Sequence, residues 1–370
     1  MKHKEEKKIN STLKRILKVS KNNLDIESLT LSSQKIFKKA ISDLLNEENI
    51  NKKIKFKLKS NVIAEINTLK DKDLPRYLVH RYRYEIFPET KTIDDFPPYL
   101  QIEPTSICNY RCVFCFETDK TFTNKKNGHM GQMSIDLFKR VIDQAEGNIE
   151  FISLASRGEP LVCADIIKML KYTEGKFLNL KLNTNASLLD ENKSHAILSG
   201  GVKTIVFSAD AATEPLYSKL RVNGSLSKVL KNIENFKKIK EKHYSRNPII
   251  SRVSGVKFNN QQDLSSMEKV WGDLVDQVAF VNYNPWENSY DKTPNNIIEP
   301  CSDLWRRMFI WWDGKVNPCD VDYKSILSVG QFTESNLKKM WNSKEYNTLR
   351  KEHLIKNRKK IKPCSSCTVI

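Results

Sequence analysis

The sequence contains no long hydrophobic run. None of its stretches approaches the roughly 20 consecutive apolar residues that a membrane-spanning helix needs. The first eight residues are mostly charged and no apolar segment follows them, so the start does not resemble a secretory signal. The six histidines are scattered, and none pairs with another at metal-binding spacing. We therefore expect a cytoplasmic protein without a membrane span, and we predict no histidine-based metal site.

Acidic residues are scarce relative to basic ones. The chain carries 62 Lys and Arg against 44 Asp and Glu, a formal net charge of +18. Residues 1–100 hold 22 basic and 14 acidic side chains, a net charge of +8, and residues 350–363 hold 7 and 1, a net charge of +6. Such segments could attract nucleic acid, phosphorylated substrates or an acidic electron donor. A lysine-rich solvated surface has the same composition, so both interpretations stay open.

The eight cysteines are interpreted as ligands rather than as disulfide partners, because nothing in the sequence directs the chain to an oxidising compartment. Seven of them fall into two groups, which are described below. The eighth, Cys163, lies in an apolar stretch and is predicted to be a small buried hydrophobic residue.

Apolar alternation and helical periodicity predict an α/β fold. Six strands are expected, at 99–105, 149–156, 179–185, 202–210, 248–258 and 276–283. Helical patterns separate them, at 134–146, 164–174, 187–199, 213–241 and 262–273. Strands that alternate with helices form a parallel sheet with right-handed crossovers, either a partial barrel or a doubly wound sheet.

The regions on either side of this pattern differ from it. Residues 1–60 are predicted to form two amphipathic helices and an edge strand, Ile54 to Leu58, in which apolar residues alternate with lysines. Residues 73–98 are rich in aromatic residues and proline, and are predicted to be a packed lead-in with two turns. Beyond residue 300 we expect a hairpin that turns at Asp313-Gly314 and one helix over 336–357.

The first cysteine group, Cys108, Cys112 and Cys115, lies in the segment EPTSICNYRCVFCF directly after the first expected strand. Thiolates at this spacing can converge on one side of a short loop, where they supply three ligands and leave a fourth position open. An iron–sulfur cluster with one open iron fits that number, whereas structural zinc requires four ligands. The loop after a strand is also where α/β folds place their chemistry.

The second group consists of Cys301, Cys319, Cys364 and Cys367. Gly314 is predicted to turn the hairpin so that Cys319 folds back toward Cys301. Four thiolates could close either a zinc site or a [4Fe–4S] cluster, and the spacing alone favours zinc.

The first cysteine group resembles the hallmark of the radical S-adenosylmethionine (SAM) enzymes, including the aromatic residue before the last cysteine, here Phe114. The resemblance implies a partial (β/α)6 TIM-like barrel, open on one side for substrate, over residues 98–290. A mostly helical extension, 1–97, would precede it and a small auxiliary-cluster domain, 291–370, would follow. It also implies that a [4Fe–4S] cluster on Cys108, Cys112 and Cys115 holds SAM.

The resemblance extends to further residues at the strand ends. Glu159 in SRGEP corresponds to the family's GGEP-type motif, which binds the amino group of SAM, although Arg157 stands where the family has its first glycine. Comparable positions after the fourth strand contact the ribose, and an arginine some ten residues on, Arg221, pairs with the SAM carboxylate. The cofactor-binding residues implied in this way are Phe114, Glu159, Asn185, Ser208, Asp210 and Arg221. The catalytic acid or base is not identified.

After such a barrel, the second cysteine group resembles the SPASM/twitch auxiliary-cluster domain, which reverses the preference from zinc to one auxiliary [4Fe–4S] cluster. Its spacing is similar to that of the deoxy-scyllo-inosamine dehydrogenase branch. The resemblance implies an oxidoreductase that acts on a sugar, aminocyclitol or nucleotide-linked sugar and receives electrons from a flavodoxin- or ferredoxin-type donor. The alternatives are a maturase of ribosomally made peptides and, more distantly, a zinc protein that binds nucleic acid.

Overall fold

A computed structural model describes residues 2–45 and 53–370. Within these residues the main sheet has nine strands, in the order β11-β10-β9-β1-β3-β4-β5-β7-β8. The strands of this sheet are β1 (Tyr99–Ile102), β3 (Phe151–Leu154), β4 (Asn179–Thr184), β5 (Val202–Ser208), β7 (Ile250–Lys257), β8 (Gln277–Asn282), β9 (Arg307–Ile310), β10 (Lys315–Asn317) and β11 (Gly330–Gln331). A separate antiparallel pair consists of β2 (Arg111–Cys112) and β6 (Arg221–Val222).

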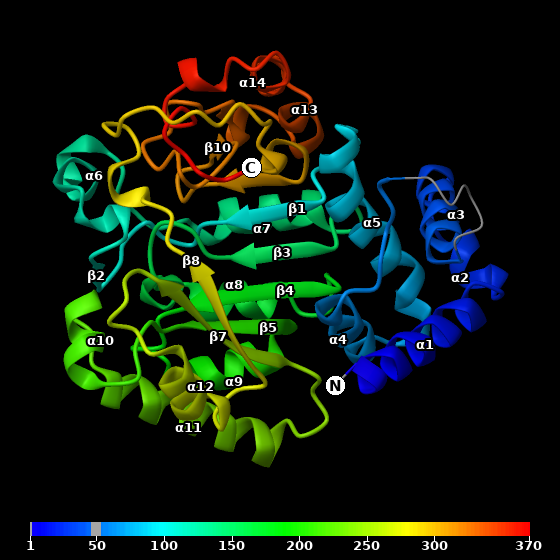
Figure 1. Cartoon of the computed structure of the whole chain (residues 1–370), viewed down its shortest axis with the longest axis horizontal. Helices are drawn as coiled ribbons and strands as arrows, with labels where there is room; N and C mark the ends of the chain where they lie inside the picture. The colour runs from blue at the N-terminus through cyan, green and yellow to red at the C-terminus, as the bar shows by residue number, and fades with distance from the viewer. Residues whose placement is uncertain (1, 46–52) are drawn as a thin grey trace.

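The six strands from β1 to β8 in the main sheet are mutually parallel and follow the six predicted strands. The helices between them are α7 (Ile135–Ala145), α8 (Ile166–Tyr172), α9 (Glu191–Ser199), α10 (Glu214–Leu220), α11 (Leu226–His243) and α12 (Leu264–Gly272). In Figure 1, α7, α8 and α9 lie behind the strands, and one apolar core joins them to the sheet. The predicted α/β fold with its parallel sheet is confirmed.

The C-terminal residues extend this sheet. Strand β9 pairs in parallel with β1, and β10 returns antiparallel to β9, which confirms the predicted hairpin at Asp313-Gly314. The single helix predicted over 336–357 is wrong, because the structure has α13 (Leu337–Trp341) and α14 (Lys344–Leu354). Ser343 separates them and caps α14, since its hydroxyl accepts a hydrogen bond from the N–H of Tyr346.

The N-terminal residues form α1 (Lys2–Val19), α2 (Asn23–Glu27), α3 (Leu31–Leu45), α4 (Ser60–Thr68) and α5 (Leu74–Thr90). Figure 1 shows these helices at the end of the sheet opposite the arrowheads of β1 and β3. Their own apolar core includes Phe151 and Leu178, at the start of β3 and just before β4. The extension therefore packs against the N-terminal ends of the barrel strands.

Two further predictions of local structure are wrong, and a third is right only in part. Residues Ile54 to Leu58 form no strand, because the side chain of Phe56 is buried among helices and its N–H donates to Asp43. The lead-in at 73–98 is packed as predicted, but most of it is the helix α5, with Pro88 inside the helix rather than at a turn. The helix predicted over 213–241 is split into α10 and α11 by a turn at Asn223, whose φ is +71°.

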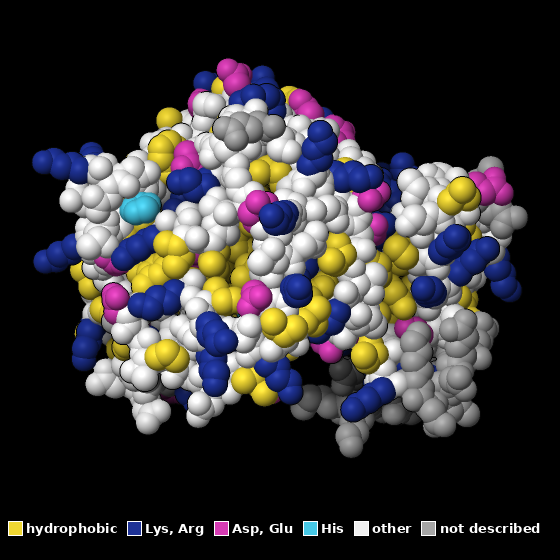
Figure 2. All heavy atoms as spheres, turned by 90° about the horizontal axis from the view of Figure 1, so that it is seen from above, with side chains coloured by type: hydrophobic (Ala, Val, Ile, Leu, Met, Phe, Trp, Pro, Cys, Tyr) yellow, Lys and Arg dark blue, Asp and Glu magenta, His cyan; other side chains and the backbone are white. Residues whose placement is uncertain are grey.

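No helix in the described residues is long and apolar enough to cross a membrane. Figure 2 shows Lys and Arg side chains spread over the face that it displays rather than gathered in one patch.

Candidate functional site

The cysteine loop follows β1 and forms one wall of a cavity of about 510 Å³ at the C-terminal ends of the strands. Cys108, Cys112 and Cys115 all line this cavity. Strand β2 fixes Cys112 opposite Arg221 of β6, and an Arg221 Nη1 lies 3.8 Å from the Cys112 sulfur. Burial raises the pKa of all three thiols. Without a nearby positive charge such as that of a metal ion, these buried thiols favour the neutral form.

Glu159 is held at the edge of the same cavity by three hydrogen bonds. Its carboxylate accepts from the Thr184 hydroxyl (2.6 Å), the Asn185 N–H (2.7 Å) and the Leu161 N–H (3.1 Å). Burial raises the pKa of Glu159, and these donors oppose the rise. A carboxylate with three donors still has lone pairs free to accept a bond from a bound ammonium group.

Arg157, the departure from the family motif, has a structural role. Its guanidinium forms a bidentate ion pair with Glu103, with Nε–Oε2 and Nη2–Oε1 distances of 2.7 and 2.5 Å, and Nη1 donates to the Tyr323 carbonyl. Both charged side chains are almost completely buried. Arg157 thus ties the SRGEP loop to the end of β1 and to the C-terminal residues.

The next residue, Gly158, is needed for close packing. A Cβ atom there would lie 2.4 Å from the Thr105 carbonyl oxygen, so no other residue fits without a shift of the backbone. The Glu159 N–H donates to the Ile107 carbonyl, which joins the Glu159 loop to the cysteine loop.

Arg221 lines the cavity, whereas Asp210 lies behind it. The Arg221 Nε is 2.5 Å from Asp210 Oδ2, and the other Asp210 oxygen accepts from the Val256 N–H at 2.6 Å. Burial by itself would lower the pKa of Arg221. The attraction of the Asp210 carboxylate is larger, so the net effect is a raised pKa. Asp210 is therefore placed to orient Arg221 rather than to contact a molecule in the cavity.

The other predicted cofactor residues are brought together as expected. Phe114, Asn185 and Ser208 all line the cavity. The amide nitrogen of Asn185 donates to Asn109 of the cysteine loop at 3.0 Å. The structure also places Tyr283 and Trp286 in the wall, after β8, which sequence reasoning did not identify.

The second cysteine group surrounds a cavity of about 220 Å³. Cys301, Cys319, Cys364 and Cys367 come from three separate segments and all line it. Burial raises the pKa of each of these thiols, that of Cys301 to about 12. The buried Arg358 holds the C-terminal segment by donating to the carbonyls of Cys364 and Cys367.

The two cavities adjoin. Trp286, Arg307 and Asp320 line both of them, and Asp320 directly follows Cys319. Burial raises the pKa of Asp320 to about 6. Among the described residues, no group of three or more His, Cys, Asp or Glu side chains is close enough to share one metal ion. A [4Fe–4S] cluster needs a wider arrangement, because each thiolate binds a different iron.

Sequence reasoning missed the polar residues inside the barrel. Gln101, Ser153 and Lys181 line the larger cavity from β1, β3 and β4. A signal was present, because Lys181 alternates with Leu180 and Leu182 and so belongs to the inward-facing side of the strand.

Two family models match the chain. The Radical SAM superfamily model matches residues 102–264, and the SPASM model, an iron–sulfur cluster-binding domain, matches residues 301–368. Together they cover more than half of the chain, and each contains one of the cysteine groups. The chain belongs to the radical SAM superfamily. Its radical SAM domain binds a [4Fe–4S] cluster and SAM, and its SPASM domain is of the type that binds auxiliary iron–sulfur clusters. These matches favour an iron–sulfur cluster over a zinc ion at the second cysteine group.

The relatives that this radical SAM protein resembles in sequence are named for two different activities. A GTP 3',8-cyclase of Clostridium botulinum (strain Okra / Type B1) is 28% identical over 216 residues, which span 56% of this chain and 64% of the relative. A tungsten-containing aldehyde ferredoxin oxidoreductase cofactor-modifying protein of Pyrococcus furiosus is 24% identical over 302 residues, 68% of this chain and 83% of that one.

Solved structures share the fold. The crystal structure of BtrN in complex with AdoMet and 2-DOIA superposes with a TM-score of 0.53 at 16% identity and covers 75% of this chain and 95% of BtrN. Streptococcus suis SuiB bound to the precursor peptide SuiA superposes with a TM-score of 0.56 at 18% identity. The superposition covers 90% of this chain and 81% of SuiB. At such identities the superpositions establish the architecture of this radical SAM enzyme and not its substrate.

Proposed function

We propose that this enzyme cleaves SAM reductively and uses the resulting deoxyadenosyl radical to oxidise or modify a sugar, aminocyclitol or nucleotide-linked sugar, with the auxiliary cluster as electron acceptor. The observation that carries the proposal is the contact between the two cysteine-lined cavities, which share Trp286, Arg307 and Asp320. A substrate in the larger cavity would lie directly beside the auxiliary centre.

The residues of the chain fit the cofactors by donor type and position. Cys108, Cys112 and Cys115 would hold the first cluster and leave its fourth iron open for SAM. Glu159 would accept a hydrogen bond from the ammonium group of SAM, and Arg221 would pair with the carboxylate of SAM. The remaining wall residues that face the cofactor would be Phe114, Asn185 and Ser208.

The auxiliary centre is proposed to transfer electrons rather than to bind substrate. Cys301, Cys319, Cys364 and Cys367 supply one thiolate for each iron of a [4Fe–4S] cluster, so no iron is left open for a substrate atom. A flavodoxin- or ferredoxin-type protein is the proposed donor of the electron that initiates SAM cleavage, and the basic surface suits an acidic partner.

A second candidate is a maturase of ribosomally made peptides. It is favoured by the superposition on SuiB bound to its precursor peptide, which covers 90% of this chain. The helical N-terminal extension, however, shows no exposed sheet edge in its described residues to which a peptide could add as a strand.

Anaerobic reconstitution tests the proposal. We expect about eight irons and eight sulfides per chain, and deoxyadenosine when SAM and dithionite are added. About four irons together with deoxyadenosine would leave the C-terminal cysteines without a cluster and would refute the electron-acceptor role. Zinc without iron would refute the proposal entirely.

A further inference from the structure

The barrel contains a second polar cavity, at the opposite end of the strands from the cysteine loop. Its volume is about 200 Å³, and we call it the floor cavity. Asn179 of β4 and Thr204 of β5 line it from the sheet, and Glu65 of α4 and His80 of α5 line it from the N-terminal extension. The extension thus supplies one wall of a cavity inside the barrel.

The floor cavity adjoins the cavity that holds the cysteine loop. Tyr99, Lys181 and Arg307 line both. Lys181 lies three residues before Thr184, which binds Glu159, and three residues of a β-strand span about 10 Å. A molecule about 10 Å long could therefore extend from the Glu159 loop to the boundary between the two cavities.

The floor cavity carries excess positive charge. Four cationic residues line it, Arg81, Lys181, Arg252 and Arg307, against one lining carboxylate, Glu65. Two of the four already have carboxylate partners outside the lining, since Arg81 pairs with Glu85 and Arg307 with Asp303. Glu65 already accepts a hydrogen bond from the Tyr77 hydroxyl at 2.7 Å and lies 4.0 Å from Arg81.

Two of these cations lack an anionic partner. In the described residues, no carboxylate lies within ion-pair distance of Lys181 or Arg252, and Lys181 makes no hydrogen bond. Arg252 donates only to the neutral Gln277 side chain, whose Oε1 accepts from Nε at 2.9 Å and from Nη2 at 2.5 Å. Burial, with Arg307 and Arg252 nearby, lowers the pKa of Lys181 to about 8. An anion in the cavity would satisfy both cations.

Side-chain nitrogen atoms without a hydrogen-bond partner border the same cavity. His80 is 4% exposed, and its Nε2 has no partner in the described structure, nor does the Nε of Arg81. The His80 ring is fixed by stacking on Phe151 with 3.8 Å between the ring centroids. Buried polar atoms without partners are rare in folded proteins, so they mark a position where a hydrogen-bond partner is missing.

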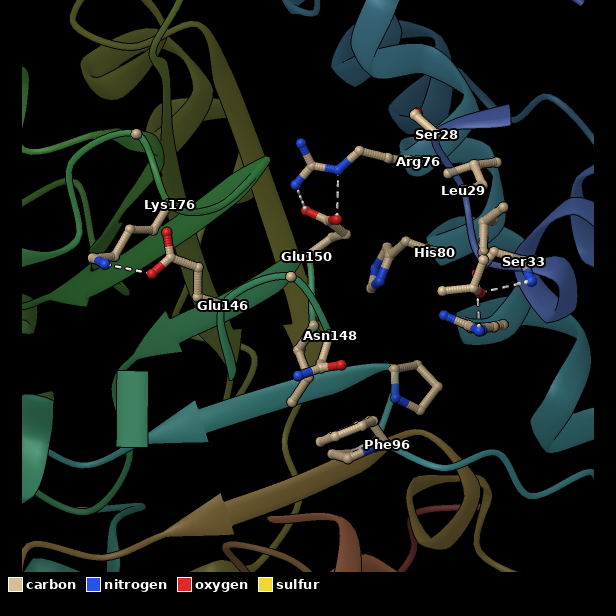
Figure 3. Close-up of a pocket in the computed structure, with 18 residues that line it drawn as sticks. Ser28, Leu29, Ser33, Arg76, His80, Phe96, Glu146, Asn148, Glu150 and Lys176 are labelled. Carbon is tan, nitrogen blue, oxygen red and sulfur yellow. Dashed lines mark hydrogen bonds and ion pairs between the residues drawn. The ribbon is translucent and has the colours of Figure 1, made fainter. Parts of the chain in front are cut away.

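In a neighbouring pocket the charged side chains are paired with one another, as is usual for buried charges. Figure 3 shows this pocket, of about 430 Å³, between the N-terminal helices and the barrel, with His80 also on its wall. Its charged residues are paired: Arg76 forms two hydrogen bonds of 2.7 Å with Glu150, and Lys176 pairs with Glu146. The unpaired cations of the floor cavity are thus a local exception.

We propose that the floor cavity binds an anionic group of the substrate, a phosphate or a carboxylate, through Lys181 and Arg252. The proposal rests on the proposed function and narrows its substrate class. A phosphorylated or nucleotide-linked sugar fits the excess positive charge, whereas the ammonium group of an aminocyclitol would be repelled by it.

Calorimetric titration of the reconstituted holoenzyme tests the site, with inorganic phosphate and UDP-glucose as probes. Removing one charged donor, in Lys181→Met or Arg252→Gln, should weaken binding of each probe about tenfold or more. Lys203→Met is the matched control, because Lys203 lies on β5 and lines neither the floor cavity nor the larger cavity. Equal affinities in wild type and both variants, or no binding of either probe to wild type, would overturn the proposal.

Competition between the probes distinguishes a substrate group from a free anion. If phosphate raises the apparent dissociation constant of UDP-glucose in wild type, the cavity binds the phosphate of the sugar nucleotide. If both bind at once without competition, the cavity holds a free anion and the substrate assignment is overturned. Iron content and deoxyadenosine release in wild type test the proposed function separately, since neither measurement involves the floor cavity.

Discussion

The buried ion pair between Arg157 and Glu103 allows a quantitative prediction. Glu103→Gln keeps the shape of the side chain but removes the charge that compensates the buried guanidinium. The side chain of Arg157 is 2% exposed and that of Glu103 is 0% exposed. Removing one partner of a buried pair typically costs about 3–5 kcal/mol of unfolding free energy, because the remaining charge is left uncompensated.

The expected shift in melting temperature follows from the length of the chain. At about 2.1 cal/mol/K per residue, unfolding of 370 residues has an entropy of about 0.8 kcal/mol/K. Glu103→Gln should therefore lower the melting temperature by about 4–6 °C, measured by differential scanning calorimetry. SAM affinity, measured by equilibrium dialysis on the reconstituted enzyme, should fall as well, because Arg157 directly precedes the Gly158-Glu159 loop.

The chain contains a matched control. Arg76 and Glu150 form the same bidentate geometry at 2.7 Å, but Arg76 is 38% exposed (Figure 3). Since partly exposed ion pairs contribute about 1 kcal/mol or less, Glu150→Gln should shift the melting temperature by about 1 °C. Equal shifts for the two variants would refute the argument that burial makes the Arg157–Glu103 pair important.

Three other predictions concern the site. Replacing Cys108, Cys112 and Cys115 by Ala should abolish deoxyadenosine release from SAM. The variants Cys319→Ala and Cys364→Ala should still release some deoxyadenosine but form no product. Normal product formation by these two variants would exclude an electron-acceptor role for the auxiliary cluster. Asp210→Asn should weaken SAM binding about tenfold by releasing Arg221, and the loss should not add to that of Arg221→Lys if Asp210 acts only through Arg221. The Lys181 amine loses its proton near pH 8 in the folded protein but keeps it to about pH 10.5 when unfolded. The unfolded state then binds more protons between these values, so stability should rise with pH across that window in wild type and less so in Lys181→Met, as followed by urea denaturation.

Local sequence patterns determined part of the fold and of the candidate site. Cysteine spacing picked out the two groups of cysteines that each line a cavity, and apolar alternation located all six barrel strands, since both signals depend on neighbours in the sequence. Patterns of the same kind failed where the outcome depended on distant partners. Residues Ile54 to Leu58 alternate like a strand, but no strand pairs with them in the described structure, and Phe56 packs among helices instead.

Only the tertiary structure decided how the functional groups combine. Asp210 was predicted to contact SAM, but the position of β7 directs its carboxylate to Arg221 and the Val256 N–H. Arg157 was an unexplained departure until β1 placed Glu103 against it. The floor cavity depends on residues from α4, α5 and the barrel strands that no local pattern connects. Sequence determined which cysteine groups and which strands are present, because those signals are short-range. Folding determined which charges are compensated, because compensation depends on side chains brought together from distant parts of the chain.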